Sequence, residues 1–526
     1  MPAGARGREF RQTAVRGAQR AFHGVELGGD LLVLLRGRGI GDGGETSRKL
    51  LERGGERGEL CFRGGHRSII SRHGGGVRTA AGIWPPPATS TIVGFMSLAV
   101  LDLRGVPAPQ LAAKVARQVP VGQLPTEAVR SILEEVRENG DAAVRAFTER
   151  FDGVAVDTLR VPPEQVREAL ASLPAELREA LELAHGRIVA YHRQERGPEE
   201  DFESDGVTVR RLVRPVGRAG LYAPGGRARY PSTVLMCAVP AKVAGVEELA
   251  LCVPPGRDGT VATETLAAAG IAGVDEVYRV GGAQAVAAMA FGTETIRPVE
   301  VIVGPGNRFV AEAKRQVSGI VGVPSAFAGP SEVVVVADDT VPAEWVAVDV
   351  IVQAEHGPDG LAWLVTWSEK MAEEALAQID RLVRSSPRRS DLASTLDTGG
   401  SLVLVDGPAE AIALANAVAP EHLELLVEGA EALLPLVRCA GAVYCGPYSP
   451  ASIGDYLAGP NHVLPTARSA RFSSALRVDD FCTHIHAVSV GRDALLRLGP
   501  YVETIALAEG LPAHALSIQL RNRGPG

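Results

Sequence analysis

Apolar residues from position 126 onward recur first at helical spacing and then in short runs typical of strands. TEAVRSILEEVRENG at 126–140 and the longer stretch at 162–194 repeat apolar residues at the period of amphipathic helices. The stretch at 207–226 is strand-like and ends at Pro-Gly-Gly. From 232 the two patterns alternate, with helical stretches between short runs such as ELALCVP, DEVYRV and VEVIVGPG.

The same alternation continues beyond residue 330. The apolar runs EVVVVAD, LAWLVTW, SLVLVDG, HLELLV and AGAVYCG follow one another, and a predicted helix separates each from the next. Strands that alternate with helices form parallel sheets whose faces the helices cover. We therefore predict an α/β protein with two Rossmann-like parallel-sheet domains and small helical or irregular terminal segments.

Changes in this pattern suggest the domain boundaries. A chain of 526 residues is too long for one hydrophobic core. We expect a small N-terminal helical segment at 96–125. A discontinuous first α/β domain would combine 126–221 with 332–472, and 222–331 would form the second. A small appendage at 473–526 would complete the chain.

The first 95 residues differ from the rest of the chain. They are rich in arginine and scattered glycine, as in RGGERGELCFRGGHR, and show little sustained periodicity. Such a segment buries too little apolar surface to offset its ordering entropy, so we predict that 1–95 is mostly disordered. We favour the interpretation that it is a start-site artefact, because Met96 begins MSLAVLDLRG, which resembles a natural start.

Composition narrows the class of protein. The apolar fraction of 46% and the charged fraction of 22% are those of a globular protein. The net charge of −8 argues against a general nucleic-acid or anionic-membrane partner. No apolar stretch is long enough to span a membrane. The six cysteines form no C-x-x-C pair, which indicates a reducing cytoplasm and no thiolate metal site.

Two glycine turns follow predicted strands and precede predicted helices. They are GGAQA at 281–285, which contains Gln284, and GPGN at 304–307, which ends on Asn307. Ligands of open α/β sheets bind outside the carboxyl ends of the strands, and helix N-termini there favour phosphates. Neither turn matches the G-x-G-x-x-G fingerprint, so they are either a nucleotide site or simply tight loops.

Candidate proton carriers and metal ligands occur in separate polar segments. In QAEHGPDG at 353–360, Gln353 and His356 either share a helical face and bind an ion, or are ordinary polar residues at a helix end. In APEHLELL, the adjacent Glu421 and His422 suit proton transfer if the loop turns both into one cleft. GDYLAGPNHVLPT contributes Asp455 and His462, and AEGLPAH contributes Glu509 and His514. Together these groups suit zinc or a similar divalent ion.

The thiols offer a rival chemistry. Cys237 in VLMCAVPAKVAG could trap an aldehyde as a nucleophile, but its apolar neighbours at helical spacing favour core packing. The CTHIH segment with Cys482, His484 and His486 resembles a metal cluster. Its spacing of two equally fits one face of a strand, which we prefer because no fourth ligand is near.

Ten segments, in this order, resemble the motifs of the histidinol dehydrogenase family. They are DLRG, GLYAPGG, LMCAVPAKVAG, GGAQAVAAMAFGT, GPGNRFVAEAKRQV, AGPSEVVVVAD, QAEHGPDG, PEHLELL, GDYLAGPNHVLPT and AEGLPAH. The resemblance covers about 96–526 and leaves out 1–95, in agreement with a start at Met96.

This resemblance implies a reaction and its cofactors. The family oxidises L-histidinol to L-histidine in two NAD-dependent steps, through an enzyme-held aldehyde. It uses one zinc ion per subunit and forms an intertwined homodimer. The zinc ligands implied are Gln353, His356, Asp455 and His514, with His514 supplied by the partner subunit. The segment 473–526 would then be the appendage exchanged between subunits.

The resemblance also assigns the remaining roles. His422 would take the alcohol proton and act again in the second oxidation, while Glu421 would activate the water that hydrates the aldehyde. Substrate binding would involve Ser331, His462 and Glu509 together with Gln353, His356, His422, Asp455 and His514. NAD would contact Tyr222, Gln284 and Asn307, which makes 222–331 the NAD-binding domain.

Two departures from the family pattern touch none of these roles. The sequence has SPASIGDY where many relatives have SPES, so the acid is lost at Ala451, and PSAFAGPSE lacks the usual Asp-Met. A rival interpretation is a dehydrogenase of another amino alcohol or a sulfonate, against which Glu421, His462 and Glu509 argue. A second is an inactive NAD-binding relative, which the intact ligand set disfavours.

Overall fold

The computed structural model describes six backbone ranges between residues 24 and 80, and residues 98–524 except 115–123, 198–200, 226–228, 325–330 and 357–359. Side chains are described from residue 98 on, apart from those of Ala112 and His356. The chain divides into two compact units, Met1–Thr89 and Ser90–Gly526.

The first unit contains an antiparallel meander in which each strand pairs with the next. Its strands are β1 (Gly24–Leu27), β2 (Asp30–Arg36), β3 (Arg48–Arg53), β4 (Glu56–Arg63), β5 (His66–His73) and β6 (Gly76–Ala80). The sequence did not predict these strands, and the other residues of 1–95 lie outside the described residues. A Gly-Gly pair separates four of the five paired strand ends in the sequence, and such pairs favour two-residue hairpins. The expected start at Met96 lies outside the described residues.

A four-stranded parallel sheet forms the core of one part of the second unit. Its order is β12 (Glu276–Tyr278), β11 (Glu248–Cys252), β10 (Arg218–Tyr222) and β13 (Val301–Val303). One face packs on α2 (Thr126–Asp152), α7 (Gly282–Phe291) and α8 (Arg308–Val317). The other packs on α3 (Pro163–Ser172), α4 (Ala175–Glu195), α5 (Pro231–Ala244) and α6 (Thr263–Ile271). Successive side chains of β10 alternate between these cores, as in a strand buried on both faces.

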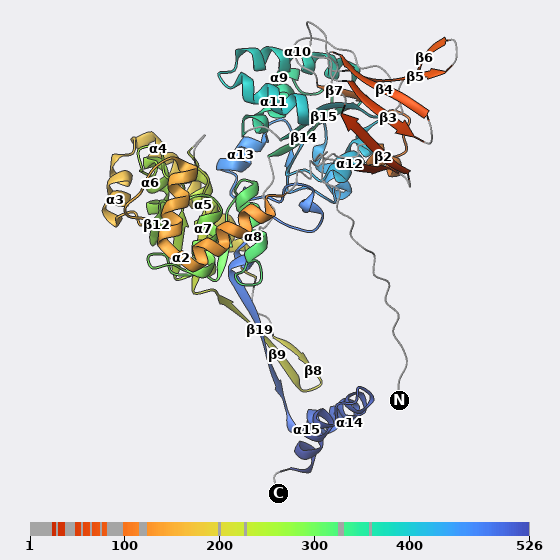
Figure 1. Cartoon of the computed structure of the whole chain (residues 1–526). Coiled ribbons are helices and arrows are strands. Elements are labelled where there is room, and N and C mark those ends of the chain that lie inside the picture. Colours follow the sequence, from red (N-terminus) through yellow and green to blue (C-terminus); the bar gives the residue numbers. More distant parts are fainter. Residues whose placement is uncertain are drawn as a thin grey trace, which may run out of the picture. The chain divides into compact units, whose positions relative to one another are not determined.

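Helices α2 to α4 therefore pack with 222–331, whereas the sequence placed 126–221 in a domain with 332–472. The contacts are α2 against α7, α3 against α6 and α4 against α5 (Figure 1). Apolar periodicity shows which face of a helix is buried, but not which of two similar sheets it meets. Only the tertiary structure shows which sheet each helix covers.

A six-stranded parallel sheet forms the second part. Its order is β18 (Ala442–Cys445), β17 (His422–Leu426), β14 (Glu332–Ala337), β15 (Leu361–Thr366), β16 (Gly400–Leu404) and β7 (Ala99–Asp102). Helices α9 (Ala343–Val352), α10 (Glu369–Ser385) and α11 (Arg389–Gly399) cover one face. Helices α1 (Ala108–Lys114) and α12 (Pro408–Val418) and the turn η2 (Ala430–Leu436) cover the other. The segment predicted as small and helical at 96–125 thus supplies the edge strand β7 as well as α1.

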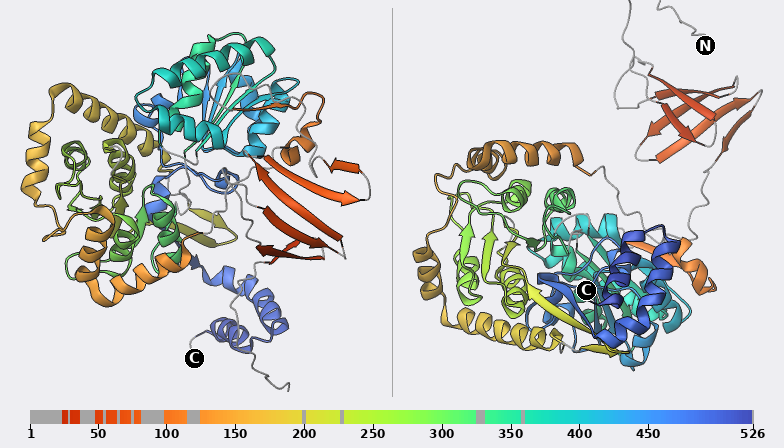
Figure 2. Two further views of the ribbon diagram at one scale, coloured as in Figure 1. Left: turned by 45° about the horizontal axis from the view of Figure 1, so that its top comes forward. Right: turned by 90° about the horizontal axis from the view of Figure 1, so that it is seen from below.

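The predicted α/β class with two parallel sheets is confirmed. The C-terminal region is more regular than predicted: β19 (Cys482–Val490) pairs along β9 (Val207–Pro215), which also pairs with β8 (Phe202–Ser204). Beyond this ribbon, α14 (Arg492–Ala508) and α15 (Pro512–Arg523) pack on each other, away from both parallel sheets (Figures 1 and 2). Residues 482–486 lie in β19, as the strand interpretation of CTHIH predicts.

No helix among the residues that the structure describes is both long enough and apolar enough to cross a membrane.

Candidate active site

The polar residues predicted for catalysis gather at the amino edge of the six-stranded sheet. Ser331 directly precedes β14, and Glu421 directly precedes the neighbouring strand β17. The 3₁₀ turn η1 (Gln353–His356) follows α9 on the way to β15. In a 3₁₀ turn residues three apart eclipse one another, so the Q-x-x-H spacing places both positions on one side of the turn. Adjacent parallel strands and one short turn therefore bring distant motifs together.

Glu332 holds the two strands in register at this edge. Its backbone N–H donates to Glu421 Oε2 at 3.1 Å, and the N–H of Glu421 donates back to Glu332 Oε2 at 3.3 Å. The other oxygen, Glu332 Oε1, accepts from the N–H of Ala467 at 3.0 Å. Glu332 is only 1% exposed, so these donors compensate much of the cost of burying its charge. It lies within the AGPSE motif but was not singled out from the sequence.

His422 is oriented through both ring nitrogens. Nδ1 lies 3.1 Å from the carbonyl oxygen of Glu332, which can only accept, so Nδ1 carries the proton and donates. Nε2 faces Asp455 Oδ1 at 3.3 Å, and the ring stacks on Tyr444 with centroids 5.9 Å apart. Burial opposes the charged form, but the carboxylates of Glu421 and Asp455 outweigh it and raise the pKa of His422.

Glu421 lies beside His422 despite the alternation expected along a strand. Glu421 Oε2 is 3.6 Å from His422 Nδ1. The chain reaches this position through Ala419, a non-glycine residue in the left-handed region with φ of 51°. Burial and the nearby Asp455 raise the pKa of Glu421 to about 7, although His422 lowers it. A carboxyl group with this pKa can exchange a proton near neutrality.

Asp455 joins the remaining predicted residues. It lies on α13 (Ala451–Tyr456), and its Oδ2 accepts from Gln353 Nε2 at 3.3 Å. Its backbone carbonyl accepts from His462 Nδ1 at 2.9 Å, and His462 Nε2 lies 3.3 Å from Thr233 Oγ1 on α5. The group therefore lies where the six-stranded part meets a helix of the four-stranded part.

Two further carboxyl groups, which the sequence did not indicate, lie behind this group. Glu424 is fully buried on β17, two residues after His422, and its Oε1 accepts from the backbone N–H of Ala451 at 3.1 Å. Burial, together with the nearby Asp349 of α9, raises the pKa of Glu424 well above its ordinary value. Glu424 thus holds the first residue of α13, the helix that bears Asp455.

Three predicted residues are not brought into this group within the chain. The side chain of His356 lies outside the described residues. Glu509 and His514 are exposed on the C-terminal pair of helices. Among the side chains that the structure describes, no three His, Cys, Asp or Glu residues are grouped to hold a metal ion.

The residues predicted for nucleotide binding line one cavity of about 650 Å³. Tyr222, Gln284 and Asn307 follow or end strands β10, β12 and β13, so the cavity opens at the carboxyl edge of the four-stranded sheet. The Tyr222 hydroxyl accepts from the N–H of Gly282 at 3.1 Å, and Asn307 caps α8 by accepting from Phe309 at 3.0 Å. Gln284 is 1% exposed, and neither end of its amide has a hydrogen-bond partner among the described residues. An orphaned buried amide in a cavity suits a polar ligand.

A glycine keeps this edge compact. Gly304 in the GPGN turn has φ of 107°, and a Cβ there would collide with the backbone carbonyl of Tyr222. The buried Lys314 of α8 donates to the carbonyl of Gly304. Glycine at position 304 therefore lets the GPGN turn lie directly against the backbone of Tyr222.

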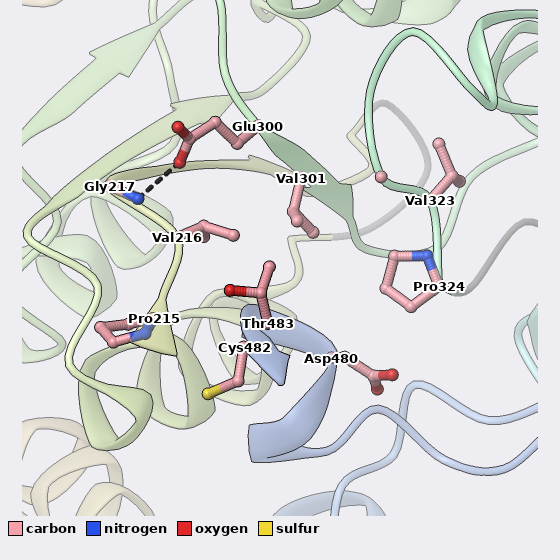
Figure 3. Close-up of a pocket in the computed structure, with 11 residues that line it drawn as sticks. Pro215, Val216, Gly217, Glu300, Val301, Val323, Pro324, Asp480, Cys482 and Thr483 are labelled. Carbon is pink, nitrogen blue, oxygen red and sulfur yellow. Dashed lines mark hydrogen bonds between the residues drawn. The ribbon is translucent and has the colours of Figure 1, made fainter. Parts of the chain in front are cut away.

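Other candidates are less suited to chemistry. A cavity of about 620 Å³ lies at the base of the ribbon, and Glu300 accepts from the N–H of Gly217 at its wall (Figure 3). None of the predicted site residues lines it. Cys237 is 1% exposed, and burial raises the pKa of its thiol to about 12, which confirms core packing rather than a nucleophile.

Comparison with known proteins identifies the family of this chain. The histidinol dehydrogenase family model matches residues 118–522. Histidinol dehydrogenase from Parasynechococcus marenigrum is 50% identical over 391 residues, which is 74% of this chain and 89% of that protein. The chain belongs to the histidinol dehydrogenase family.

Further relatives extend the match. Histidinol dehydrogenase from Bordetella parapertussis is 47% identical over 399 residues, covering 75% of this chain and 90% of that protein. The crystal structure of histidinol dehydrogenase from Elizabethkingia anophelis superposes with a TM-score of 0.78 at 33% identity, covering 82% of this chain and 99% of that one. The chain is thus an oxidoreductase of histidine biosynthesis that oxidises histidinol.

Proposed function

We propose that this enzyme carries out the zinc-requiring, NAD-dependent four-electron oxidation of L-histidinol to L-histidine, by way of L-histidinaldehyde, as a cytoplasmic homodimer. The observation that carries the proposal is the convergence of Gln353, Glu421, His422, Asp455 and His462 at one edge of the six-stranded sheet. These five residues come from three motifs, far apart in sequence, that meet there within hydrogen-bonding distance or close to it.

The donor set fits zinc. Gln353 and Asp455 offer an amide and a carboxylate on side chains that already touch, and η1 carries His356 three positions after Gln353. His514 of the partner subunit would complete the set. When bound, zinc orients the imidazole and amine of the substrate. Ser331, His462 and Glu509 would contact the substrate alongside these ligands.

His422 is the proposed base for the hydroxyl proton. The carbonyl of Glu332 holds the proton on Nδ1, so Nε2 is the atom that gains and loses a proton. Each oxidation removes a hydride, which NAD accepts, and a proton, which Nε2 takes. The neighbouring carboxylates stabilise the imidazolium that results.

Glu421 is the proposed base for hydration of the aldehyde. Its pKa of about 7 lets it accept a proton from water as the oxygen adds to the carbonyl carbon. The hydrate again carries a hydroxyl group, and Nε2 of His422 takes that proton in the second oxidation. The product is a carboxylate after the loss of a second hydride.

The cavity with Tyr222, Gln284 and Asn307 is the proposed NAD site. Its position at the carboxyl edge of a parallel sheet supports this, as does the unpartnered amide of Gln284. The capped N-terminus of α8 lies beside it and favours phosphate.

The exposed apolar surface of the C-terminal helices supports a homodimer. Tyr501 is 70% exposed and Ile505 is 60% exposed, and Leu511, Leu516 and Leu520 are exposed nearby. Surface of this kind on a projecting arm suits a second copy of the chain. The same arm carries Glu509 and His514, so exchange of arms would deliver both to the other subunit's site.

The stoichiometry of NADH production tests the proposal. The purified full chain, supplied with zinc and excess NAD, is expected to produce two NADH for each L-histidinol consumed, with L-histidine as the product. One NADH would contradict the four-electron reaction and show that oxidation stops at the aldehyde. No NADH from a folded, zinc-loaded protein would contradict the assignment of substrate or cofactor.

A further inference from the structure

Asp152 occupies an unfavourable position for a carboxylate. It is the last residue of α2, and it lines the same cavity as Tyr222, Gln284 and Asn307. The C-terminal end of a helix carries partial negative charge and favours cations. Burial alone raises the pKa of Asp152 to about 6. Two effects therefore disfavour the ionised form of Asp152: the negative end of the helix dipole and the loss of solvent around the carboxylate.

The described residues leave one oxygen of the Asp152 carboxylate unsatisfied. Its Oδ2 is buried without a hydrogen-bond partner in the described part of the chain. Asp141, a buried acid on the same helix, shows the contrast: it accepts from the side chains of Thr293, Thr295 and Arg145. Asp141 has the partners of a structural carboxylate, whereas Asp152 retains acceptor capacity beside a cavity.

The chemistry of the cavity limits what can satisfy Asp152. Its other titratable lining residues are Tyr222, whose hydroxyl already accepts from Gly282, and Arg257, which is exposed. An ionised carboxylate only accepts hydrogen bonds, so its partner must bring O–H or N–H donors, and it repels phosphate. On a pyridine dinucleotide the paired hydroxyls of a ribose offer two adjacent donors.

The catalytic group indicates which half of the dinucleotide lies here. None of Glu421, His422 and Asp455 lines this cavity, whereas the nicotinamide ring must reach the substrate that they contact. The cavity is therefore assigned to the adenosine half. We propose that Asp152 binds the hydroxyls of the adenosine ribose and selects NAD against dinucleotides that carry a 2′-phosphate. This rests on the NAD-dependent function proposed above.

Direct binding of the two dinucleotides tests this role without reference to turnover. The wild-type chain, Asp152→Asn and the control Asp157→Asn are each titrated calorimetrically with NAD and with NADP, and their melting temperatures are measured. Asp157 is exposed on the same connection after α2, so its change removes one charge without touching the cavity.

For Asp152→Asn we expect the Kd for NAD to rise by roughly tenfold, because a hydrogen bond to a charged acceptor is lost. The preference for NAD over NADP should fall by at least about tenfold, because repulsion of the phosphate disappears as well. The melting temperature should rise by about 2 °C or more, since an unfavourable buried charge is removed. Asp157→Asn should match the wild type in the Kd for both dinucleotides.

Three results would overturn the inference. The first is an unchanged Kd for NAD in Asp152→Asn, and the second is an unchanged preference between NAD and NADP. The third is a lowered melting temperature with both affinities intact, which would mark Asp152 as structural. Failure of the wild-type chain to bind NAD would instead contradict the proposed cofactor itself, so the two failures are distinguishable.

Discussion

Glu332 acts on the proposed chemistry through both its backbone and its side chain. Its carbonyl fixes the tautomer of His422, its N–H donates to Glu421, and its carboxylate receives the N–H of Glu421 and of Ala467. A residue with no proposed role in proton transfer thus sets the direction in which both proposed bases point. Such orienting groups are commonly as important as the groups they orient.

The base assignment predicts a selective loss in His422→Asn. Turnover of L-histidinol should fall by about a thousandfold or more, because no group remains to take the hydroxyl proton. Zinc content should stay that of the wild type, because His422 is not among the proposed ligands. Kinetics and metal analysis of the same preparation check both expectations.

His185→Asn is the matched control, since His185 lies on α4 and outside the proposed site. It should retain the wild-type rate. Retained turnover in His422→Asn, or loss of zinc together with turnover, would refute the assignment of His422 as the base.

Strand β17 carries two residues of the proposed site region on one face. His422 is the proposed base, and Glu424 supports the helix that bears Asp455. Glu424 accepts from the N–H of Ala451, where α13 begins, and α13 carries Asp455. The buried carboxyl group at the start of α13 thus comes from strand β17.

Glu424 should make stability depend on pH. In the unfolded chain it ionises near its ordinary pKa, whereas burial and Asp349 keep it protonated to much higher pH in the folded chain. The folded state therefore binds more protons above that ordinary pKa, and the free energy of unfolding falls as pH rises. Glu424→Gln removes this loss, so the variant should be more stable than the wild type at pH ~8 by on the order of 1 kcal/mol.

Denaturant unfolding at pH ~5 and ~8 measures the difference. Glu373→Gln on the exposed face of α10 serves as the control and should keep the wild-type dependence. An equal pH dependence in Glu424→Gln and the wild type would show that Glu424 is already ionised in the folded protein.

At the scale of the whole molecule, the proposed site residues fall into two groups in the described part of the chain. Gln353, Glu421, His422 and Asp455 belong to the six-stranded part, while Glu509 and His514 lie exposed on the projecting helices. Exchange of arms in a homodimer would join them. In that case each active site takes its proposed bases from one subunit and His514 from the other.

Mixed dimers test this sharing. His422→Asn and His514→Asn should each be inactive alone, but co-expression should restore about a quarter of wild-type activity, because half of the dimers are mixed and each contains one intact site. Pairing His422→Asn with Glu421→Gln is the control and should restore nothing, since both changes affect the same side of the site. No recovery in the first pair would place His514 in its own subunit's site or outside the site.

The sequence by itself determined the fold class and the motifs that carry chemistry. Alternating apolar runs specify parallel strands and covering helices because burial on both faces requires such runs. The Gly-rich turns predicted the position of the cavity that Gln284 and Asn307 line, because ligand sites follow the carboxyl ends of parallel strands. Motif order was sufficient to indicate the family.

Tertiary structure alone decided which elements meet. Helices α2 to α4 cover the four-stranded sheet, because periodicity records a buried face and not its partner. The proposed catalytic group lies at the amino edge of its sheet, where no general rule predicts a ligand site. Glu332, Glu424 and Asp152 emerged only from their surroundings. The sequence does not show whether a carboxylate is exposed to solvent, hydrogen-bonded within the protein, or buried without a partner. Only the packing of the folded chain distinguishes these three states.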